Sequence, residues 1–388
     1  MQPGRNLAVK LREVSSITRN AEKSMKTLTL ISAGIGKPEP EELERRERAD
    51  ETPRATLFEK TLESDMLDER YFHSLSPVRR RVYGTLPVHV AQVIEAYRVY
   101  RRYDAIISWA EHLGLPLAGL LKVTGARIPH VCIFSWISKR KKAHLLKRVY
   151  SHIDRLILMS SVQRDFAINN LGIPASRITF LRWAVDQKFW RPMDVPSTTI
   201  CSVGREMRDY ATLIEAMRGL DIPCHIAAGG IVAGKNDAWK ARANGTVPRH
   251  VTVGRKSFSD LRALYACSRF VVIPVLPTDT DNGTTSILEA MAMGKTVICS
   301  QVEGQKDVIV EGKTGLFVPP RDPRALRDAI HYLWTNPDVA EGMGRAARTY
   351  VEQHHTLDQW LRDVKRVVAD VITEHKEGAA AGEFLRVT

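Results

Sequence analysis

The sequence contains no apolar run of 18 residues, and none of its five cysteines forms a C-x-x-C pair. Since a membrane-spanning helix needs about 20 consecutive apolar residues, no such helix is predicted. An odd number of scattered cysteines argues against a disulfide scaffold or a zinc framework, and it favours a reduced, cytoplasmic protein. The 12 histidines show no metal-ligand spacing such as H-E-x-x-H, so the sequence predicts no metal site.

The overall composition is that of a folded, globular protein. Of the 388 residues, 44% are hydrophobic and 26% are charged, close to the average of globular domains. These values exclude a collagen-like chain and a mostly disordered one. A chain of this length is long enough to form two domains, each with its own core.

Basic charge is concentrated in the first half of the chain. The formal net charge is +13, and the basic stretch from Arg79 to Arg148 contains only three acidic residues, Glu95, Asp104 and Glu111. Such an imbalance points to an anionic partner, either nucleic acid or a membrane surface. The stretch has no recognisable nucleic-acid reader motif, so we expect no nucleic acid as a partner. An anionic membrane surface and a simple solvated basic face remain as alternatives.

Short apolar segments alternate with helical patterns along most of the chain, and they are typical of buried parallel strands. Such alternation predicts an α/β fold, in which right-handed crossovers connect the strands of a parallel sheet. The predicted strands are 27–34, 103–108, 130–136, 154–160, 198–204, 224–230, 250–254, 269–275, 296–300 and 314–320. The predicted helices include 86–101, 140–151, 209–219, 258–267, 286–293 and 323–335.

A segment with two prolines, FWRPMDVPS at 189–197, separates two such series. Proline interrupts regular structure, so the sequence predicts two Rossmann-like domains that face each other across a cleft. Ligands are then expected at the carboxyl ends of the strands. We expect an N-terminal extension at 1–25, a first domain at 26–192, a second at 193–354, and a C-terminal helix and tail at 355–388 that crosses back to the first domain.

The stretch 279–320 is the most informative part of the chain. A polar turn follows a predicted strand, and a helix is expected to begin at Ser286. Backbone N–H groups at a helix start bind phosphate, aided by the helix dipole. Glu289, one turn into this helix, is placed to accept both hydroxyls of a ribose, and Asp281 at the loop mouth is placed to meet a hexose. The candidate phosphate-binding residues are Gly283, Thr284, Thr285 and Ser286.

Two simpler interpretations of these residues stay open. Ser286-x-x-Glu289 fits a capping box, a local helix-start motif that needs no ligand. Asp279 and Asp281 form a D-x-D pair of the kind that can hold a divalent metal. Two aspartates are common in turns, so we expect no metal here.

The segment resembles the donor-binding signature of retaining glycosyltransferase family 4, which has the GT-B fold. In that family two acids separated by seven residues are followed by E-A-M-A-x-G-x-P-V-I, and here Asp281 and the stretch EAMAMGKTVI (289–298) match. The stretch GKTGLFVP (312–319) resembles the family pattern downstream, and Val203-Gly204-Arg205 resembles its first strand and loop. The resemblance covers about 198–335, whereas the first half shows only a compatible topology and the turn Ala184-Val185-Asp186.

The resemblance implies that the second domain binds a nucleotide-diphosphate sugar and that the first is the acceptor-side domain. Arg205 would neutralise the diphosphate. A lysine that the family places five or six positions after the Gly-Arg pair is missing, so Arg208 is the candidate replacement. The first acid, Asp281, replaces the usual Glu. His112, or its neighbour Glu111, follows strand 103–108 and would contact the transferred sugar.

The resemblance therefore implies a retaining glycosyltransferase of the hexosyltransferase type that needs no metal or other cofactor. Its catalytic residues would be Asp281, Glu289 and His112, and its acceptor an envelope glycolipid or polysaccharide. Two alternatives keep the same fold: a nucleotide-sugar epimerase or hydrolase, and a non-catalytic nucleotide-sugar-binding homologue. The expected location is the cytoplasm, either free or peripheral on the inner face of the membrane.

Overall fold

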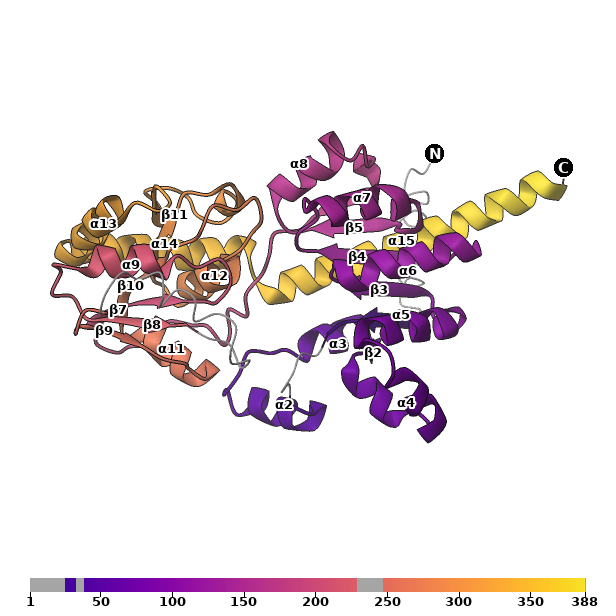
Figure 1. Cartoon of the computed structure of the whole chain (residues 1–388), viewed down its shortest axis with the longest axis horizontal. Helices are drawn as coiled ribbons and strands as arrows, with labels where there is room; N and C mark the ends of the chain where they lie inside the picture. Colours follow the sequence, from indigo (N-terminus) through magenta and orange to yellow (C-terminus); the bar gives the residue numbers. More distant parts are fainter. Residues whose placement is uncertain (1–24, 33–37, 229–246, 388) are drawn as a thin grey trace, which may run out of the picture.

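The computed structural model describes residues 25–32, 38–228 and 247–387, which form two α/β domains (Figure 1). Each domain is built on a parallel sheet of six strands, so the predicted α/β fold is confirmed. Most of the predicted N-terminal extension, 1–25, lies outside the described residues. Among the described residues, no helix is long and apolar enough to cross a membrane.

The first sheet has the strand order β2-β1-β3-β4-β5-β6. Two of its inner strands, β1 and β4, are buried along their whole length because helices cover both faces. The strands are β1 (Thr27–Leu30), β2 (Ser64–Leu67), β3 (Ala105–Trp109), β4 (His130–Phe134), β5 (Arg155–Leu158) and β6 (Ile178–Phe180). The helices are α2 (Pro40–Arg48), α3 (Leu57–Leu62), α4 (Pro77–Tyr83), α5 (Val88–Val99), α6 (Glu111–Thr124), α7 (Arg140–Val149) and α8 (Ser161–Asn169).

The second sheet has the strand order β12-β11-β10-β7-β8-β9. The order reverses between β7 and β10, and open α/β sheets bind ligands at such a point. Its strands are β7 (Thr199–Val203), β8 (Cys224–Ala227), β9 (Val251–Val253), β10 (Ser268–Ile273), β11 (Thr296–Ser300) and β12 (Gly315–Val318). Its helices are α9 (Tyr210–Met217), α11 (Phe258–Ala266), α12 (Thr284–Ala292), α13 (Pro323–Thr335) and α14 (Pro337–His354).

The sequence did not predict the two edge strands of the first sheet. β2 has a central pair of residues that is exposed or half-buried, and all three residues of β6 are only half-buried. Both strands are short and only partly buried, so neither has the continuous apolar run that marks a strand buried on both faces.

The C-terminal helix α15 (Leu357–Val387) packs on the first domain (Figure 1). It contacts α3 and β4, and its buried residues Leu361, Val364 and Val368 belong to the same apolar cluster as Ile107 and Val131 of the sheet. The chain thus crosses between the domains twice, once before β7 and once before α15.

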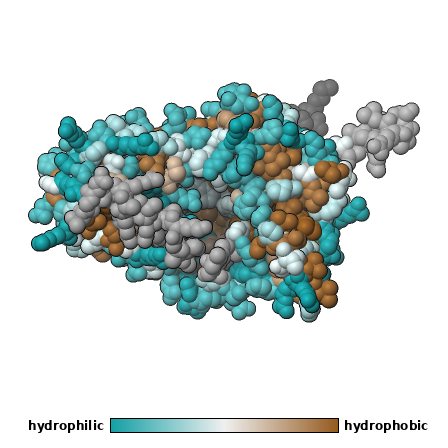
Figure 2. All heavy atoms as spheres, in the orientation of Figure 1, coloured by the Kyte–Doolittle hydropathy of each residue, from teal (hydrophilic) through white to brown (hydrophobic). Residues whose placement is uncertain are grey.

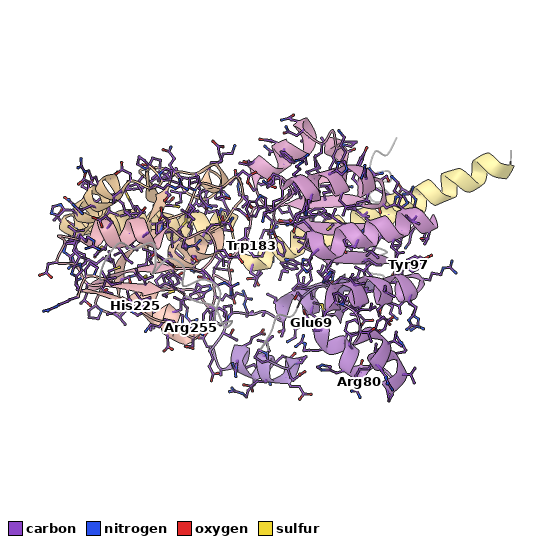
Figure 3. The ribbon with its side chains drawn as sticks, viewed as in Figure 1. Glu69, Arg80, Tyr97, Trp183, His225 and Arg255 are labelled. Atoms are coloured by element: carbon purple, nitrogen blue, oxygen red, sulfur yellow. The ribbon has the colours of Figure 1, made fainter. Side chains whose placement is uncertain are left out.

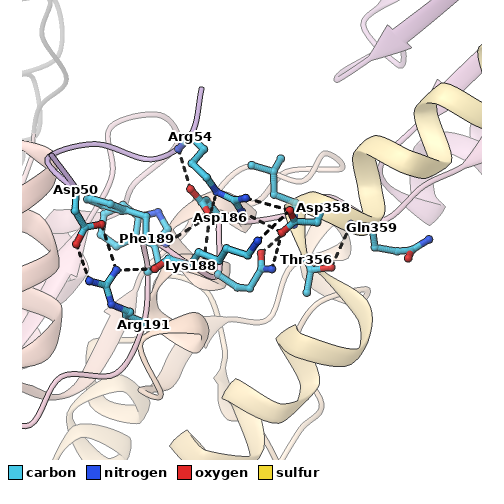
Figure 4. Close-up of polar contacts among 12 residues, drawn as sticks. Asp50, Arg54, Asp186, Lys188, Phe189, Arg191, Thr356, Asp358 and Gln359 are labelled. Carbon is cyan, nitrogen blue, oxygen red and sulfur yellow. Dashed lines mark hydrogen bonds and ion pairs between the residues drawn. The ribbon is translucent and has the colours of Figure 1, made fainter. Parts of the chain in front are cut away.

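Ion pairs hold these two crossings together (Figure 4). The guanidinium of Arg54, just before α3, donates to Asp186 of the first crossing at 2.7 Å and to Asp358 of the second at 3.0 Å. Two further ion pairs extend the network: the guanidinium groups of Arg191 and Arg262 contact the carboxylate of Asp50 at 2.6 and 2.9 Å. Since Arg262 lies on α11, residues 50–54 tie the first domain to the second.

The basic helix α7 packs against its own domain. Leu146 and Val149 are buried in the core, and only Leu145 is exposed among its large apolar residues. The basic residues at the start of α7 are also engaged: Lys139, just before the helix, lies 3.7 Å above the ring centre of Trp136, and Lys142 in its first turn pairs with Glu111 at 3.3 Å. The apolar face of α7 therefore stabilises the fold of the first domain.

Candidate active site

The turn between β10 and α12 is built around Gly283. Its φ of 111° is a backbone conformation that residues with a Cβ rarely adopt, so the turn favours glycine at this position. The helix begins at Thr284, two residues earlier than the sequence predicted. Gly283, and not Ser286, is thus the N-cap residue, and the capping-box interpretation of Ser286 and Glu289 is wrong.

The first turn of α12 presents backbone N–H groups and hydroxyls to a cleft. The first turn of any helix leaves N–H groups without intrahelical partners. The hydroxyls of this turn are anchored: Thr284 lies 3.3 Å from Gln305, Thr285 accepts a hydrogen bond from Trp183 at 3.0 Å, and Ser286 accepts one from Arg208 at 3.2 Å. The turn is therefore held in place before any ligand binds.

Glu289 is buried one turn further along α12. Its Oε2 accepts a hydrogen bond from the Tyr265 hydroxyl at 2.9 Å. Burial raises the pKa of Glu289 to about 7, and the Tyr265 hydrogen bond and the charge of Arg208 oppose that rise only in part. The carboxyl lines a cavity of about 540 Å³ together with Arg255 and Phe258.

Arg208 lies beneath the loop that follows β7. Its Nε and Nη1 donate to the carbonyls of Val203 and Glu206, both at 2.8 Å. Gly204, at a φ of 117°, makes room for it, since a Cβ there would lie 2.1 Å from Nη2 of Arg208. Together with the bond to Ser286, these contacts make Arg208 the bridge between the β7 loop and α12.

Arg205 is placed differently from Arg208. Its side chain is 40% exposed, and its ion pair, with Glu206, is loose at 3.7 Å. Arg205 lines both the cavity at Glu289 and the neighbouring cleft at α12. It is therefore the more available of the two cations.

The cleft at α12 has a volume of about 400 Å³ and is formed by both domains. Asp281 lies in it, and burial raises the pKa of its carboxyl, with Glu111 and Asp307 adding to the effect. Trp109 and Ser135 enter from the first domain. Of the residues predicted from the sequence, the structure brings the following to this cleft: Arg205, Arg208, Asp281, Gly283, Thr284, Thr285 and Ser286.

His112 is not brought to the cleft. Adjacent residues of a helix point in different directions, and at the start of α6 it is Glu111 that turns inward. His112 is exposed, with its ring centre 6.4 Å from that of His89, and it lines none of the three cavities around α12. The predicted contact of His112 with the sugar is thus not supported by its position.

Glu111, by contrast, holds the loop after β4 in place. Its carboxylate accepts hydrogen bonds from the backbone N–H groups of Ser135, at 3.0 Å, and of Trp136. That loop in turn contacts the second domain, because the Ser135 carbonyl accepts from Thr280 at 3.1 Å and the Trp136 indole donates to Asp279 at 3.1 Å. Glu111 therefore positions the first domain against the loop that carries Asp281.

The D-x-D pair is part of this contact between the domains. The carboxylate of Asp279 accepts the Trp136 bond, its carbonyl accepts from Gln163 at 2.9 Å, and Asp281 accepts from the Thr280 hydroxyl at 3.0 Å. Within the described residues, no cluster of three or more His, Cys, Asp or Glu side chains has the spacing of a metal site.

Sequence reasoning missed the aromatic side of the site. Trp109 ends β3, and Trp183 lies in the segment after β6, between the two domains (Figure 3). Both line the cleft, and Arg255 lies on the side of the second domain that faces the first (Figure 3). The one available signal for Trp109 was its place at the carboxyl end of a predicted strand.

Comparison with known proteins agrees with this arrangement. Residues 197–336 match the family described as glycosyl transferases group 1. A D-inositol 3-phosphate glycosyltransferase of Paenarthrobacter aurescens is 32% identical over 298 residues, which cover 68% of this chain and 73% of that protein. The chain belongs to the group 1 glycosyltransferases.

Other relatives of this glycosyltransferase match it over a shorter stretch. D-rhamnosyltransferase WbpZ of Pseudomonas aeruginosa is 34% identical over 155 residues, which are 40% of each chain. An uncharacterized glycosyltransferase of Methanocaldococcus jannaschii is 24% identical over 41% of this chain and 44% of its own. The chain thus spans less than half the length of these two curated relatives.

Solved structures share the fold of this glycosyltransferase over most of its length. Sucrose-phosphate synthase from Thermosynechococcus elongatus superposes with a TM-score of 0.70 at 17% identity, covering 90% of this chain and all of that one. Anabaena HepE, solved in complex with UDP, has a TM-score of 0.65 at 15% identity over 89% of this chain and all of its own. The two facing domains therefore have the GT-B fold.

Proposed function

We propose that this glycosyltransferase transfers a hexose from a nucleotide-diphosphate sugar to an acceptor, with retention of the anomeric configuration. One observation carries the proposal: the cleft at the start of α12, which Arg205 and Arg208 line, adjoins the cavity that holds the buried carboxyl of Glu289, and Arg205 lines both. Those groups match the phosphates and ribose of a nucleotide sugar. The relative Anabaena HepE, whose structures contain UDP and UDP-glucose, supports this class of donor.

We infer from the positions of the cavities where each part of the donor would bind. The base would enter the cavity beside Arg255 and Phe258, and the ribose hydroxyls would meet Glu289. The diphosphate would lie between Arg205 and the first turn of α12, where helix dipole and cations both favour negative charge. The sugar would then face Asp281, close to the first domain.

Catalysis in this proposal depends on stabilising the leaving group. As the bond between the anomeric carbon and the β-phosphate oxygen breaks, negative charge grows on the diphosphate, and Arg205 and Arg208 offset it. The acceptor hydroxyl attacks the anomeric carbon from the same side, and its proton passes to the departing phosphate oxygen. No protein nucleophile is required, and retention follows from attack on the face that the phosphate leaves.

The acceptor would enter from the first domain, as an envelope glycolipid or a polysaccharide. The names of the relatives D-rhamnosyltransferase WbpZ and D-inositol 3-phosphate glycosyltransferase mention different molecules. They therefore do not point to one common acceptor. We also propose an anionic membrane surface as a second partner, because the formal net charge of the protein is +13.

Product analysis with a panel of donors tests the proposed function. The purified protein is incubated with UDP-, GDP-, dTDP- and ADP-sugars, with and without a mixture of glycolipid and saccharide acceptors, and the products are identified by mass spectrometry. We expect one donor to be consumed only when acceptor is present, and NMR of the product to show the anomeric configuration of the donor. Acceptor-independent turnover would favour an epimerase or hydrolase, and tight nucleotide binding without turnover would favour a non-catalytic homologue.

Transfer is expected to need no divalent metal. The Asp279 carboxylate is already bound by Trp136, and two arginines stand where a metal would otherwise offset the diphosphate charge. We expect turnover in excess EDTA to stay within about twofold of the untreated rate, since the cations of the protein supply the electrostatic stabilisation. Activity that disappears in EDTA and returns with Mn²⁺ or Mg²⁺ would contradict this prediction.

A further inference from the structure

A third cavity opens beside the donor cleft, between the two domains. Its volume is about 380 Å³, within the range of roughly 300–1,000 Å³ that is usual for small-molecule sites. Most of its wall is made of aromatic and aliphatic side chains. Figure 2 shows the surface hollowed between the two halves of the molecule.

Four aromatic rings from distant parts of the chain form one wall, which we call the aromatic cluster: Phe58, Trp109, Trp183 and Trp360. The ring centres of Phe58 and Trp109 are 4.9 Å apart, and those of Trp183 and Trp360 are 5.4 Å apart. Both pairs meet edge to face, an arrangement that stabilises aromatic contacts. The cluster is thus a preformed apolar surface.

The charged side chains near this wall are largely satisfied within the protein. Arg54 pairs with Asp186 at 2.7 Å, and Arg70 pairs with Asp68. Glu289, at the opposite end, is held by Tyr265. A molecule that enters the cavity therefore meets mainly carbon, and burial of its own apolar surface would drive its binding.

The cavity adjoins the cleft proposed for the donor. Trp109, Trp183 and Thr285 line both, and the hydrogen bond of 3.0 Å from Trp183 to Thr285 lies at their common boundary. A molecule seated on the aromatic cluster would thus reach the cleft at the start of α12, where the sugar and diphosphate are proposed to lie.

We propose that this cavity binds an apolar group of the acceptor, an alkyl chain or hydrophobic ring next to the hydroxyl that receives the sugar. The group would contact the aromatic cluster while the hydroxyl remains near Thr285. Binding in this cavity would favour an amphiphilic acceptor over a purely polar saccharide, because each methylene group that moves from water into the cavity raises the affinity about fourfold. The role of the hydroxyl rests on the proposed function, but binding of the apolar group does not require transfer.

The test compares two glucosides that differ only in their apolar group. Methyl and n-octyl β-D-glucoside are titrated into the full-length protein below the micelle concentration of the octyl compound, and binding is measured by calorimetry. Ala55 is exposed and lines the cavity, so Ala55→Phe is designed to fill the opening. Ala175 is also exposed but lines none of the three cavities, so Ala175→Phe is the matched control.

We expect the octyl glucoside to bind at least about tenfold more tightly than the methyl glucoside to the unaltered protein and to Ala175→Phe. That advantage should disappear in Ala55→Phe, or in the milder Ala55→Leu if the Phe variant does not fold. Equal affinity for the two glucosides, or an octyl advantage that survives filling of the cavity, overturns the proposal. UDP and GDP titrations of the same variants show separately whether the nucleotide site exists, so failure of the proposed function is distinguishable from failure of this inference.

Discussion

Replacing Arg205 with Ala is expected to lower turnover by about 100-fold or more, because a preorganised cation at the leaving group contributes on that scale. Arg205 borders both parts of the proposed donor site, and its ion pair with Glu206 is loose at 3.7 Å. Its removal should therefore leave the fold intact. Steady-state kinetics at saturating donor, with the melting temperature measured in parallel, separate these two effects.

The matched control for Arg205→Ala is Arg345→Ala. Arg345 is also exposed and also pairs loosely with a glutamate, Glu341 at 3.8 Å, but it lies on α14 and lines none of the three cavities. We expect unchanged turnover for the control. Equal activity of the two variants would remove Arg205 from the proposed mechanism.

Arg208→Ala should differ from Arg205→Ala by also lowering stability. The guanidinium of Arg208 donates to two backbone carbonyls and to Ser286, so truncation leaves the acceptors of the buried residues Val203 and Ser286 unpaired. A variant with low activity and an unchanged melting temperature would show that these contacts contribute less to stability than their geometry indicates.

Replacing Glu289 with Gln is expected to weaken donor binding at least tenfold at pH 8, about 1.4 kcal/mol or more. In the proposed function the ionised carboxylate would make charge-assisted hydrogen bonds to the ribose hydroxyls, whereas an amide would make weaker, neutral ones. In the unaltered protein, donor affinity should rise with pH up to about 7, the pKa of the buried carboxyl, and then level off. Calorimetric titration with the nucleotide diphosphate across this range measures both effects.

The same substitution is expected to stabilise the donor-free protein. Burial raises the pKa of Glu289 from 4.5 to about 7, so the folded state holds its proton more tightly than the unfolded chain does. Stability from this group is fully present below pH 4.5 and is lost as pH rises through 7. Gln carries no charge to desolvate, and at pH 8 it should recover up to about 3 kcal/mol.

Thermal unfolding at pH 5 and pH 8 checks this gain, which should be large at pH 8 and small at pH 5. Glu341→Gln, on the exposed face of α14, is the control and should change neither stability nor donor binding. A Glu289→Gln protein with full donor affinity would contradict the ribose assignment. One with no gain at pH 8 would show that the carboxylate is better solvated than its burial indicates.

The order of elements followed from the sequence wherever an element is buried on both faces. All ten predicted strands are present, and the central ones among them are apolar because helices cover both faces of a parallel sheet. The sequence did not predict β2 and β6 because these short strands are only partly buried and lack a continuous apolar run, whereas the edge strands β9 and β12 of the second sheet were predicted. The start of α12 was misplaced by two residues, since Ser286 is a common N-cap residue and the left-handed backbone of Gly283 is not visible in a sequence.

The sequence alone determined the two-domain α/β plan and the segment that carries Asp281 and Glu289, because both depend on patterns within a few neighbouring residues. The tertiary structure decided which distant side chains meet. It turned Glu111 inward and His112 outward, and it assembled the aromatic cluster from α3, β3, the first crossing and α15. Local periodicity fixes the face of a helix or strand, but contacts between elements far apart in the chain depend on how those elements pack. The apolar cavity between the domains exists only at that level.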